Sequence, residues 1–97
     1  MPDITFSEAS ADDLDRIWHD TLLYSERAAQ RIVEQLDHAA SSLVLFPQRG
    51  VRRNDLGPEF RALIIRRYLI IYRYEQPLET VTILRILEGE RDLTDLF

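Results

Sequence analysis

Apolar residues recur at helical spacing in two consecutive segments of the chain. The first begins after Ser7 and the second after Ser25, and both serines suit the N-cap of a helix. The first has an apolar face of Leu14, Ile17, Trp18, Thr21 and Leu22, opposite a polar face of Asp12, Asp13, Asp15, Arg16 and Asp20. The second has an apolar stripe of Ala29, Ile32, Val33, Leu36, Ala40, Leu43 and Phe46, and it ends before Pro47. The short junction between them predicts an antiparallel helical hairpin, with Trp18 as its anchor in the core.

Strands are predicted for the last third of the chain, where β-branched and aromatic residues dominate. The candidates are Phe60 to Ile65, Tyr68 to Tyr74 and Thr80 to Leu87, and a shorter one, Asp3 to Phe6, precedes the helices. Both faces of the middle segment are apolar, so we expect it at the centre of the sheet. Strict alternation in the last segment places Val81, Ile83, Arg85 and Leu87 on one face.

The order of these elements indicates the fold class. A chain of 97 residues suits one domain, so we expect residues 1–97 to form a single α+β unit. Its predicted architecture is an antiparallel β-sheet with a packed N-terminal helical hairpin, in the order β-α-α-β-β-β. The segment from Pro47 to Glu59 is rich in turn-forming residues and is expected to be a loop. Such a long loop is either a solvated connector or a functional segment, and it carries Arg49, Arg52 and Arg53.

Charge is distributed unevenly along the chain. The net charge of −5 divides into −6 over residues 1–40, +5 over residues 41–74 and −4 over residues 75–97. Every basic residue is an arginine. Because phosphate neutralisation dominates nucleic-acid affinity, we expect a net-acidic domain to bind no nucleic acid strongly.

Several classes of site are absent from the sequence. No apolar run approaches the roughly 18 residues of a transmembrane helix. There is no cysteine, no glycine-rich phosphate loop, and no metal-ligand spacing around His19 or His38. We therefore expect no membrane association, no metal and no cofactor. The N-terminus lacks the basic and apolar segments of a signal peptide, so the cytoplasm is the expected compartment.

Four motifs occur in order along the chain. They are Ser7-Glu8-Ala9 with Asp13-Leu14 and Ile17-Trp18, then Phe60-Arg61-Ala62-Leu63, then Arg67 to Arg73, then Ile83 to Leu93. Together they resemble the ParE/RelE toxin superfamily of bacterial toxin–antitoxin modules, which includes plasmid stabilisation systems. The resemblance covers nearly the whole chain and implies a type II toxin that a cognate ParD-like antitoxin neutralises in a hetero-oligomer. The chain departs from the pattern at Arg66, where glycine is common, and at Glu88, where histidine is common.

Two branches of this superfamily differ in chemistry. RelE-like members cleave mRNA on the ribosome, which requires cationic groups around the scissile phosphate. This chain has no lysine, carries Leu69 where those members have a strand arginine, and ends in Phe97 rather than tyrosine. The resemblance therefore favours the ParE-like branch, whose members resemble inhibitors of DNA gyrase and act by binding. A ribosome-dependent mRNA endoribonuclease and a non-toxic interaction module remain the alternatives.

Two sets of candidate site residues follow from this comparison. The target-binding candidates are four arginines on, or just beyond, the three C-terminal strands: Arg61, Arg67, Arg85 and Arg91. Each is equally open to an ion pair with a nearby acid such as Glu79, Glu90 or Asp92. The antitoxin-binding candidates are apolar residues outside the clean core stripes: Leu22, Tyr24, Val44, Leu45, Val51 and Leu56. Basic residues between Arg49 and Arg73 are expected to pair with an acidic antitoxin tail.

Overall fold

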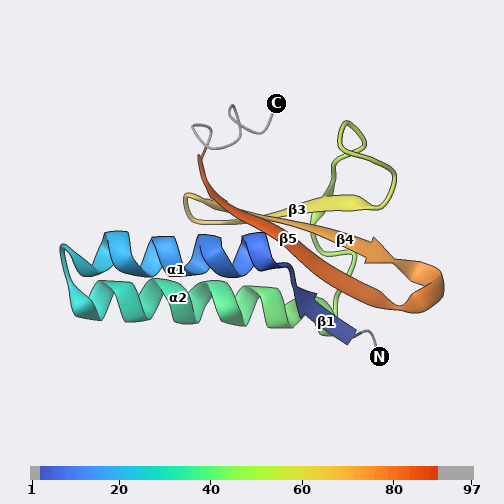
Figure 1. Cartoon of the computed structure of the whole chain (residues 1–97). Coiled ribbons are helices and arrows are strands. Elements are labelled where there is room, and N and C mark those ends of the chain that lie inside the picture. The colour runs from blue at the N-terminus through green and yellow to red at the C-terminus, as the bar shows by residue number, and fades with distance from the viewer. Residues whose placement is uncertain (1–2, 90–97) are drawn as a thin grey trace.

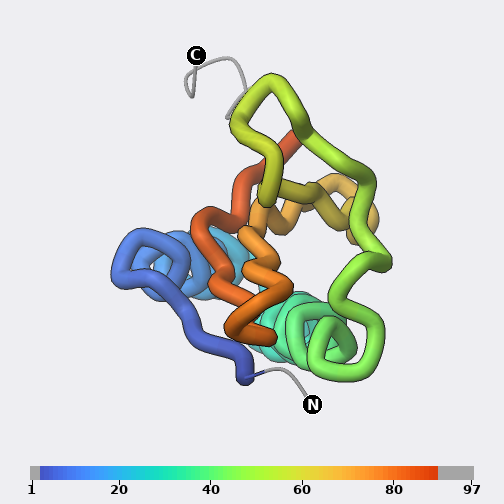
Figure 2. Tube along the Cα trace, turned by 90° about the vertical axis from the view of Figure 1, so that its right-hand side faces the viewer, coloured from blue at the N-terminus to red at the C-terminus, as the bar shows by residue number. Residues whose placement is uncertain are grey.

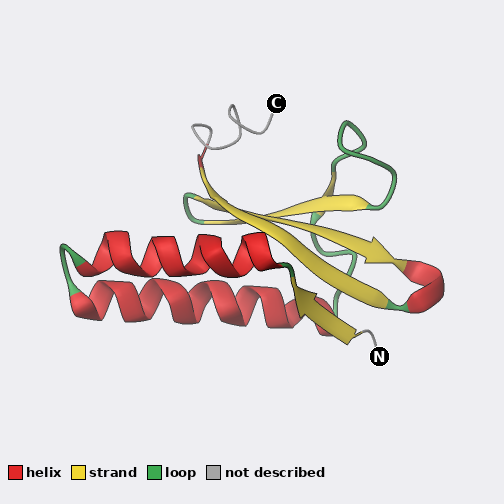
Figure 3. Cartoon of the chain, in the orientation of Figure 1, coloured by secondary structure: helices red, strands yellow, loops and turns green. Residues whose placement is uncertain are grey.

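A helical hairpin lies against one face of a five-stranded sheet in the computed structural model, which describes residues 3–89 (Figures 1 and 3). The helices are α1 (Glu8–Leu22) and α2 (Glu26–Ser41), and the short 3-10 helix η1 (Ser42–Val44) follows them. The strands are β1 (Asp3–Phe6), β2 (Val51–Arg52), β3 (Phe60–Ile65), β4 (Tyr68–Glu75) and β5 (Thr80–Glu88), with the 3-10 turn η2 (Gln76–Leu78) before the last. The predicted α+β class is confirmed, and the predicted elements occur in the predicted order with one additional short strand, β2.

Both long helices begin at the predicted serines. The Ser7 hydroxyl accepts a hydrogen bond from the Ser10 N–H, and the Ser25 hydroxyl accepts one from the Ala28 N–H. The α-helical part of the second segment ends earlier than expected, at Ser41, and tightens into η1. Phe46 then lies beyond the helix and is 61% exposed, so its predicted place in the apolar stripe is wrong.

The strand order is β1-β5-β4-β3-β2, with β4 at the centre as predicted. Neighbours from β5 to β2 pair antiparallel, whereas β1 pairs parallel with β5. The sheet is therefore mixed rather than wholly antiparallel. Apolar alternation identifies a strand but not the direction of its partner, so the sequence pattern could not reveal this parallel edge.

The segment expected to be a loop contains a short strand. β2 has two residues, and they pair antiparallel with Ala62 and Arg61 of β3. Two residues are too few to show a period of two, which is why the pattern did not predict this strand. Figure 2 shows the whole connection from α2 to β3 running along one side of the molecule, from the helical layer to the sheet.

The core lies between the helices and one face of the sheet. Its main side chains are Ile17, Leu36, Leu43, Ile70, Tyr72, Val81, Ile83 and Ile86. Trp18 is only half-buried and is not part of this core, so its predicted role as the anchor is wrong. The buried face of α1 is instead Ser10, Asp13 and Ile17. The helix is thus rotated by about one residue from the orientation that its apolar residues alone predict.

A β-bulge interrupts the last strand. Arg85 pairs with Ile71 and Ile83 pairs with Tyr72, so Leu84 has no counterpart on β4. The bulge reverses the alternation that follows it, because one extra residue moves the next side chains to the other face. Ile86 belongs to the core and Leu87 does not. The prediction that Leu87 shares a face with Val81 and Ile83 is therefore wrong.

Candidate functional site

The predicted target-binding arginines do not form one cluster. Arg61 lies on β3 opposite Tyr72, and Arg85 lies on β5 opposite Ile71. Tyr72 and Ile71 are adjacent in β4 and point to opposite faces of the sheet, so the register separates the two arginines. Arg67 lies in the turn between β3 and β4. Arg91 lies outside the described residues, as do the acids Glu90 and Asp92.

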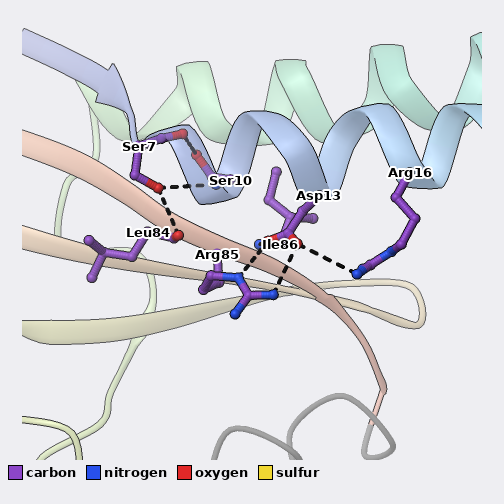
Figure 4. Close-up of polar contacts among 7 residues, drawn as sticks. All are labelled: Ser7, Ser10, Asp13, Arg16, Leu84, Arg85 and Ile86. Carbon is purple, nitrogen blue, oxygen red and sulfur yellow. Dashed lines mark hydrogen bonds and ion pairs between the residues drawn. The ribbon is translucent and has the colours of Figure 1, made fainter.

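Arg85 makes a two-pronged ion pair with Asp13 of α1 (Figure 4). Its Nε lies 2.8 Å from Asp13 Oδ2 and its Nη2 lies 3.0 Å from Asp13 Oδ1. The Ile86 backbone N–H donates to the same Oδ2 at 2.9 Å. The Asp13 side chain is only 4% exposed, whereas that of Arg85 is 36% exposed. A buried carboxylate with three donors is fully satisfied, and it ties the helical layer to β5.

Ser7, the N-cap of α1, and Asp13 of α1 occupy the free edge of β5 where β1 ends. The last paired residue of β1 is Phe6, which lies opposite Ile83. Beyond it, the Ser7 N–H donates to the Ile83 carbonyl, and the Ser7 hydroxyl donates to the Leu84 carbonyl at 2.8 Å. Asp13 then accepts the Ile86 N–H. Polar side chains thus replace a neighbouring strand and satisfy backbone groups that would otherwise be an open edge.

Arg61 and Tyr72 hold the connection that leads from α2 to β2. The Tyr72 hydroxyl donates to the Pro47 carbonyl and accepts from the Gly50 N–H, both at 2.8 Å. Arg61 Nη1 donates to the Gly50 carbonyl at 2.8 Å and to the Gln48 carbonyl at 3.1 Å. Burial raises the pKa of Tyr72, against the opposing effect of the Gly50 hydrogen bond and of nearby Arg61.

Glycine is required where this connection passes Tyr72. A Cβ added at Gly50 would lie 2.7 Å from the Tyr72 hydroxyl oxygen and 3.0 Å from the Ala62 carbonyl oxygen. Because Arg61 donates to the carbonyls of Gln48 and Gly50, it has a structural role in this connection.

Arg67 is the most exposed of the three described candidates, at 64%. Its Nε lies 3.2 Å from Glu88 Oε1, and its Nη2 lies 3.2 Å from the Tyr68 hydroxyl. The guanidinium carbon also lies 5.4 Å from the centroid of the Tyr68 ring. These contacts leave most of the side chain in solvent, so Arg67 is accessible to a partner.

The six predicted antitoxin-binding residues fall into two separate regions. Leu22 and Tyr24 are exposed at the tip of the helical hairpin. Leu45 and Val51 are exposed near the other end of α2, beside the half-buried Val44, and Leu56 is half-buried in the following connection. The 16 residues of α2 separate the two regions by about 24 Å. The candidates therefore form two patches rather than one groove.

Surface hollows lie beside α2. One of about 310 Å³ is lined mainly by Arg31, Ile32, Arg66 and Tyr68, and it adjoins one of about 650 Å³ at the hairpin tip. Arg31 was not among the candidate residues, and Arg66 was included only as one of the basic residues between Arg49 and Arg73. Arg66 had a signal in the sequence, because it stands where the resembling family often has glycine, whereas Arg31 looked like an ordinary polar position on a helix.

The described part of the chain contains neither a candidate metal site nor a helix able to span a membrane. Residues 3–89 contain no group of three or more histidine, aspartate or glutamate side chains placed to hold a metal ion. In the same range, neither helix is long and apolar enough to cross a membrane.

Comparison with known proteins identifies the family. Residues 4–93 match the family model described as "ParE toxin of type II toxin-antitoxin system, parDE". Toxin ParE3 of Caulobacter vibrioides is 32% identical over 82 residues, which cover 84% of this chain and 80% of that relative.

Solved structures share the fold. The chromosomal ParDE system from P. aeruginosa aligns with a TM-score of 0.75 at 23% identity, covering 92% of this chain and 97% of that one. The intact E. coli RelBE toxin-antitoxin complex aligns with a TM-score of 0.68 at 17% identity, covering 94% and 100%. At these identities the structures support the fold, and the family match and the curated relative decide membership. The chain belongs to the ParE toxin family of type II toxin-antitoxin systems.

Proposed function

We propose that this chain acts in the cytoplasm as a toxin that inhibits DNA gyrase and so stops replication. A cognate ParD-like antitoxin neutralises it by forming a complex. Family membership supports the toxin assignment, and the structurally similar chains come from ParDE and RelBE toxin–antitoxin systems. The choice of gyrase over the ribosome depends on the chemistry that the strand arginines can supply.

One observation supports inhibition by binding rather than by RNA cleavage: Arg61 and Arg85, the two described candidate arginines that lie within strands, are already engaged in the fold. Arg85 is held by the buried carboxylate of Asp13, and Arg61 donates to two backbone carbonyls. A phosphodiester-cleaving centre needs cations aimed at one developing charge. Arg61 and Arg85 lie opposite adjacent β4 residues that point to different faces. Their arrangement favours a protein inhibitor.

Controlled expression in a bacterium that lacks the antitoxin tests this proposal. DNA and protein synthesis are pulse-labelled during the first minutes after induction. We expect DNA synthesis to fall first, and the purified chain to inhibit supercoiling by purified gyrase. An early fall of protein synthesis, with cleavage of ribosome-bound messages, would favour the endoribonuclease alternative. Normal growth with soluble, folded protein would favour the non-toxic interaction module.

The antitoxin part of the proposal has its own test. The polypeptide encoded by the neighbouring gene of the same operon is co-expressed with the chain. We expect the two to co-elute in size-exclusion chromatography and growth to be restored. Separate elution, with toxicity unchanged, would contradict neutralisation by that polypeptide.

A further inference from the structure

A strip of exposed side chains follows the connection that leaves α2. We call residues 45–52 the connection strip. Its apolar members are Leu45, Phe46 and Val51, which are 63%, 61% and 67% exposed. Its basic members are Arg49 and Arg52, which are exposed as well. Figure 2 shows the chain running along one side of the molecule here, so the strip is accessible over its whole length.

Positive charge accompanies the apolar side chains of the connection strip. Residues 38–54 contain three arginines and no acid, in a chain whose net charge is −5. Within residues 3–89, no acid forms an ion pair with Arg49 or Arg52. Arg49 Nη1 donates instead to the Ser42 hydroxyl at 2.8 Å. Cations beside exposed apolar side chains are complementary to a protein surface on which acids surround an apolar centre.

The backbone of the connection strip is held from within the fold. The buried Tyr72 hydroxyl donates to the Pro47 carbonyl and accepts from the Gly50 N–H. Arg61 donates to the carbonyls of Gln48 and Gly50. These contacts fix the middle of the strip, while the apolar side chains on either side of it stay in solvent. A surface that is already ordered in the free protein loses little conformational entropy on binding.

A hollow of about 420 Å³ lies within the connection strip. Its lining is Phe46, Pro47, Gln48 and Arg49. The two rings give it an apolar wall, and the guanidinium gives it a cation. Aromatic and arginine side chains dominate the binding energy of many protein–protein interfaces. The hollow can therefore accept a side chain of a partner protein.

We propose that the toxin binds its protein target through the connection strip, at a site where acids of the target surround apolar side chains. This inference rests on the proposed function, in which the target is DNA gyrase. Phe46 contacts the apolar side chains of the target, and Arg52 faces its acids. A toxin that acts by binding needs a preformed surface when no antitoxin is bound, and contacts within the chain order this strip. Leu45 and Val51, which the sequence assigned to the antitoxin, contact the target in this proposal.

Other occupants fit the connection strip less well. An added β-strand would have only the two residues of β2 to pair with. A nucleic acid would gain from the arginines, but its phosphates would meet exposed apolar side chains on a chain of net charge −5. A protein surface with both apolar and acidic side chains uses both features of the strip.

A double substitution tests the proposal on exposed residues. Phe46→Ser, Arg52→Glu removes an apolar side chain and reverses a charge. The matched control, Leu78→Ser, Arg27→Glu, makes the same changes at exposed positions on η2 and α2, outside the strip. Each labelled chain is titrated with purified gyrase by fluorescence anisotropy, and inhibition of supercoiling is measured in parallel. We expect the double variant to bind about tenfold to a hundredfold more weakly, and the control to match the unmodified chain.

Two further measurements separate binding from folding. The double variant is expected to keep the urea midpoint of the unmodified chain and to co-elute with the polypeptide encoded by the neighbouring gene. The single variant Arg52→Glu leaves Phe46 in place, and we expect it to bind gyrase more weakly with a smaller change between about 0.05 M and about 0.15 M salt. A role in stability alone would not lower this salt dependence.

The outcomes distinguish the surface from the function. Gyrase binding by both strip variants equal to that of the unmodified chain would overturn the strip assignment. Loss of binding to the neighbouring polypeptide with gyrase binding intact would overturn it too, because the strip would then belong to the antitoxin. An equal loss of gyrase binding in the control would show that the strip is not the binding surface. Failure of the unmodified chain to bind or inhibit gyrase would overturn the proposed function itself.

Discussion

At the scale of single residues, Asp13 connects the two layers of the molecule. Its carboxylate is buried between α1 and β5 and accepts from the Arg85 guanidinium and the Ile86 N–H. An ion pair of this kind is costly to break from one side, because the remaining charge keeps its desolvation penalty. The two partners differ in exposure, so the two single substitutions should differ in cost.

Removal of Arg85 should be the more damaging change. Arg85→Ala leaves the buried Asp13 carboxylate with the Ile86 N–H and the longer ion pair to Arg16, at 3.7 Å, and we expect a loss of about 3 kcal/mol of unfolding free energy. Asp13→Ala leaves a hydrated Arg85 and an unbonded Ile86 N–H, and we expect a loss of about 2 kcal/mol. The double variant should cost less than the sum by about 1–3 kcal/mol. Urea unfolding followed by circular dichroism measures the loss of unfolding free energy in all three variants. A loss in the double variant equal to the sum of the two single losses would contradict coupling between Asp13 and Arg85.

This pair also changes how toxicity tests should be interpreted. A loss of toxicity in Arg85→Ala can result from a weakened fold, so it does not by itself identify a catalytic or target-binding arginine. Asp13→Ala is the appropriate comparison, because it breaks the same contact from the other side. A direct role for Arg85 requires that Arg85→Ala be less toxic than an Asp13 variant of equal stability.

Tyr72 provides a second prediction at this scale, with a defined pH dependence. Tyr72→Phe keeps the ring but removes the acceptor of the Gly50 N–H and the donor to the Pro47 carbonyl, and we expect a loss of about 1–3 kcal/mol. Burial raises the pKa of Tyr72 above its ordinary value of 10.0, so the unfolded chain loses this proton first. The contribution of the hydroxyl is therefore constant below about pH 10 and falls as the pH rises further.

Urea unfolding at pH 7, 9 and 10.5 tests whether the contribution of the Tyr72 hydroxyl to stability decreases above about pH 10. The difference between the unmodified chain and Tyr72→Phe should be equal at pH 7 and pH 9 and smaller at pH 10.5. A difference that grows with pH would show that the tyrosinate, rather than the neutral phenol, is the favoured form in the fold.

At the scale of elements, the helices and long strands could be predicted from the sequence, because each carries its own period. The segments with which these elements pair and pack could not be predicted. The bulge at Leu84, the two-residue β2 and the parallel β1–β5 pairing all depend on contacts with distant segments. Asp13 shows the same limit, because one acid among several on a helix looks solvated until its partner 72 residues away is known. Of the arginine candidates, Arg61 and Arg85 lie in strands and Arg67 lies in a turn, and the structural partners of Arg61 and Arg85 were not predicted.

The β3–β4 turn provides the prediction at this scale. Arg66 has a φ of 57°, in the left-handed region that costs a non-glycine residue roughly 1–2 kcal/mol. Arg66→Gly removes that cost but adds freedom to the unfolded chain, so we expect a net gain of about 0.5–1 kcal/mol. Arg66→Val should be destabilising, because a β-branched side chain tolerates this conformation poorly. Thermal unfolding compares the three chains, and a lower midpoint for Arg66→Gly would contradict the strain at this turn.

At the scale of the whole molecule, charge is separated in space as well as in sequence. The exposed acids Asp12 and Asp15 lie on α1, whereas the exposed cations Arg31 and Arg66 line the surface hollows beside α2. A long polyanion that approached the cations would meet the field of a chain whose total charge is −5. We therefore expect the exposed arginines to be too few for tight binding of RNA.

The corresponding prediction concerns RNA affinity. We expect a labelled single-stranded RNA to bind the purified chain with a Kd weaker than about 10⁻⁴ M at 0.15 M salt, because few phosphates can be neutralised. Fluorescence anisotropy at 0.05 M and 0.2 M salt measures the affinity and its salt dependence. A control variant with Asp12→Asn and Asp15→Asn should bind more tightly, since it removes repulsion without adding a contact. Micromolar binding with a steep salt dependence by the unmodified chain would mean that the arginines outweigh the net charge. The ribosome-dependent endoribonuclease would then become the better account of its toxicity.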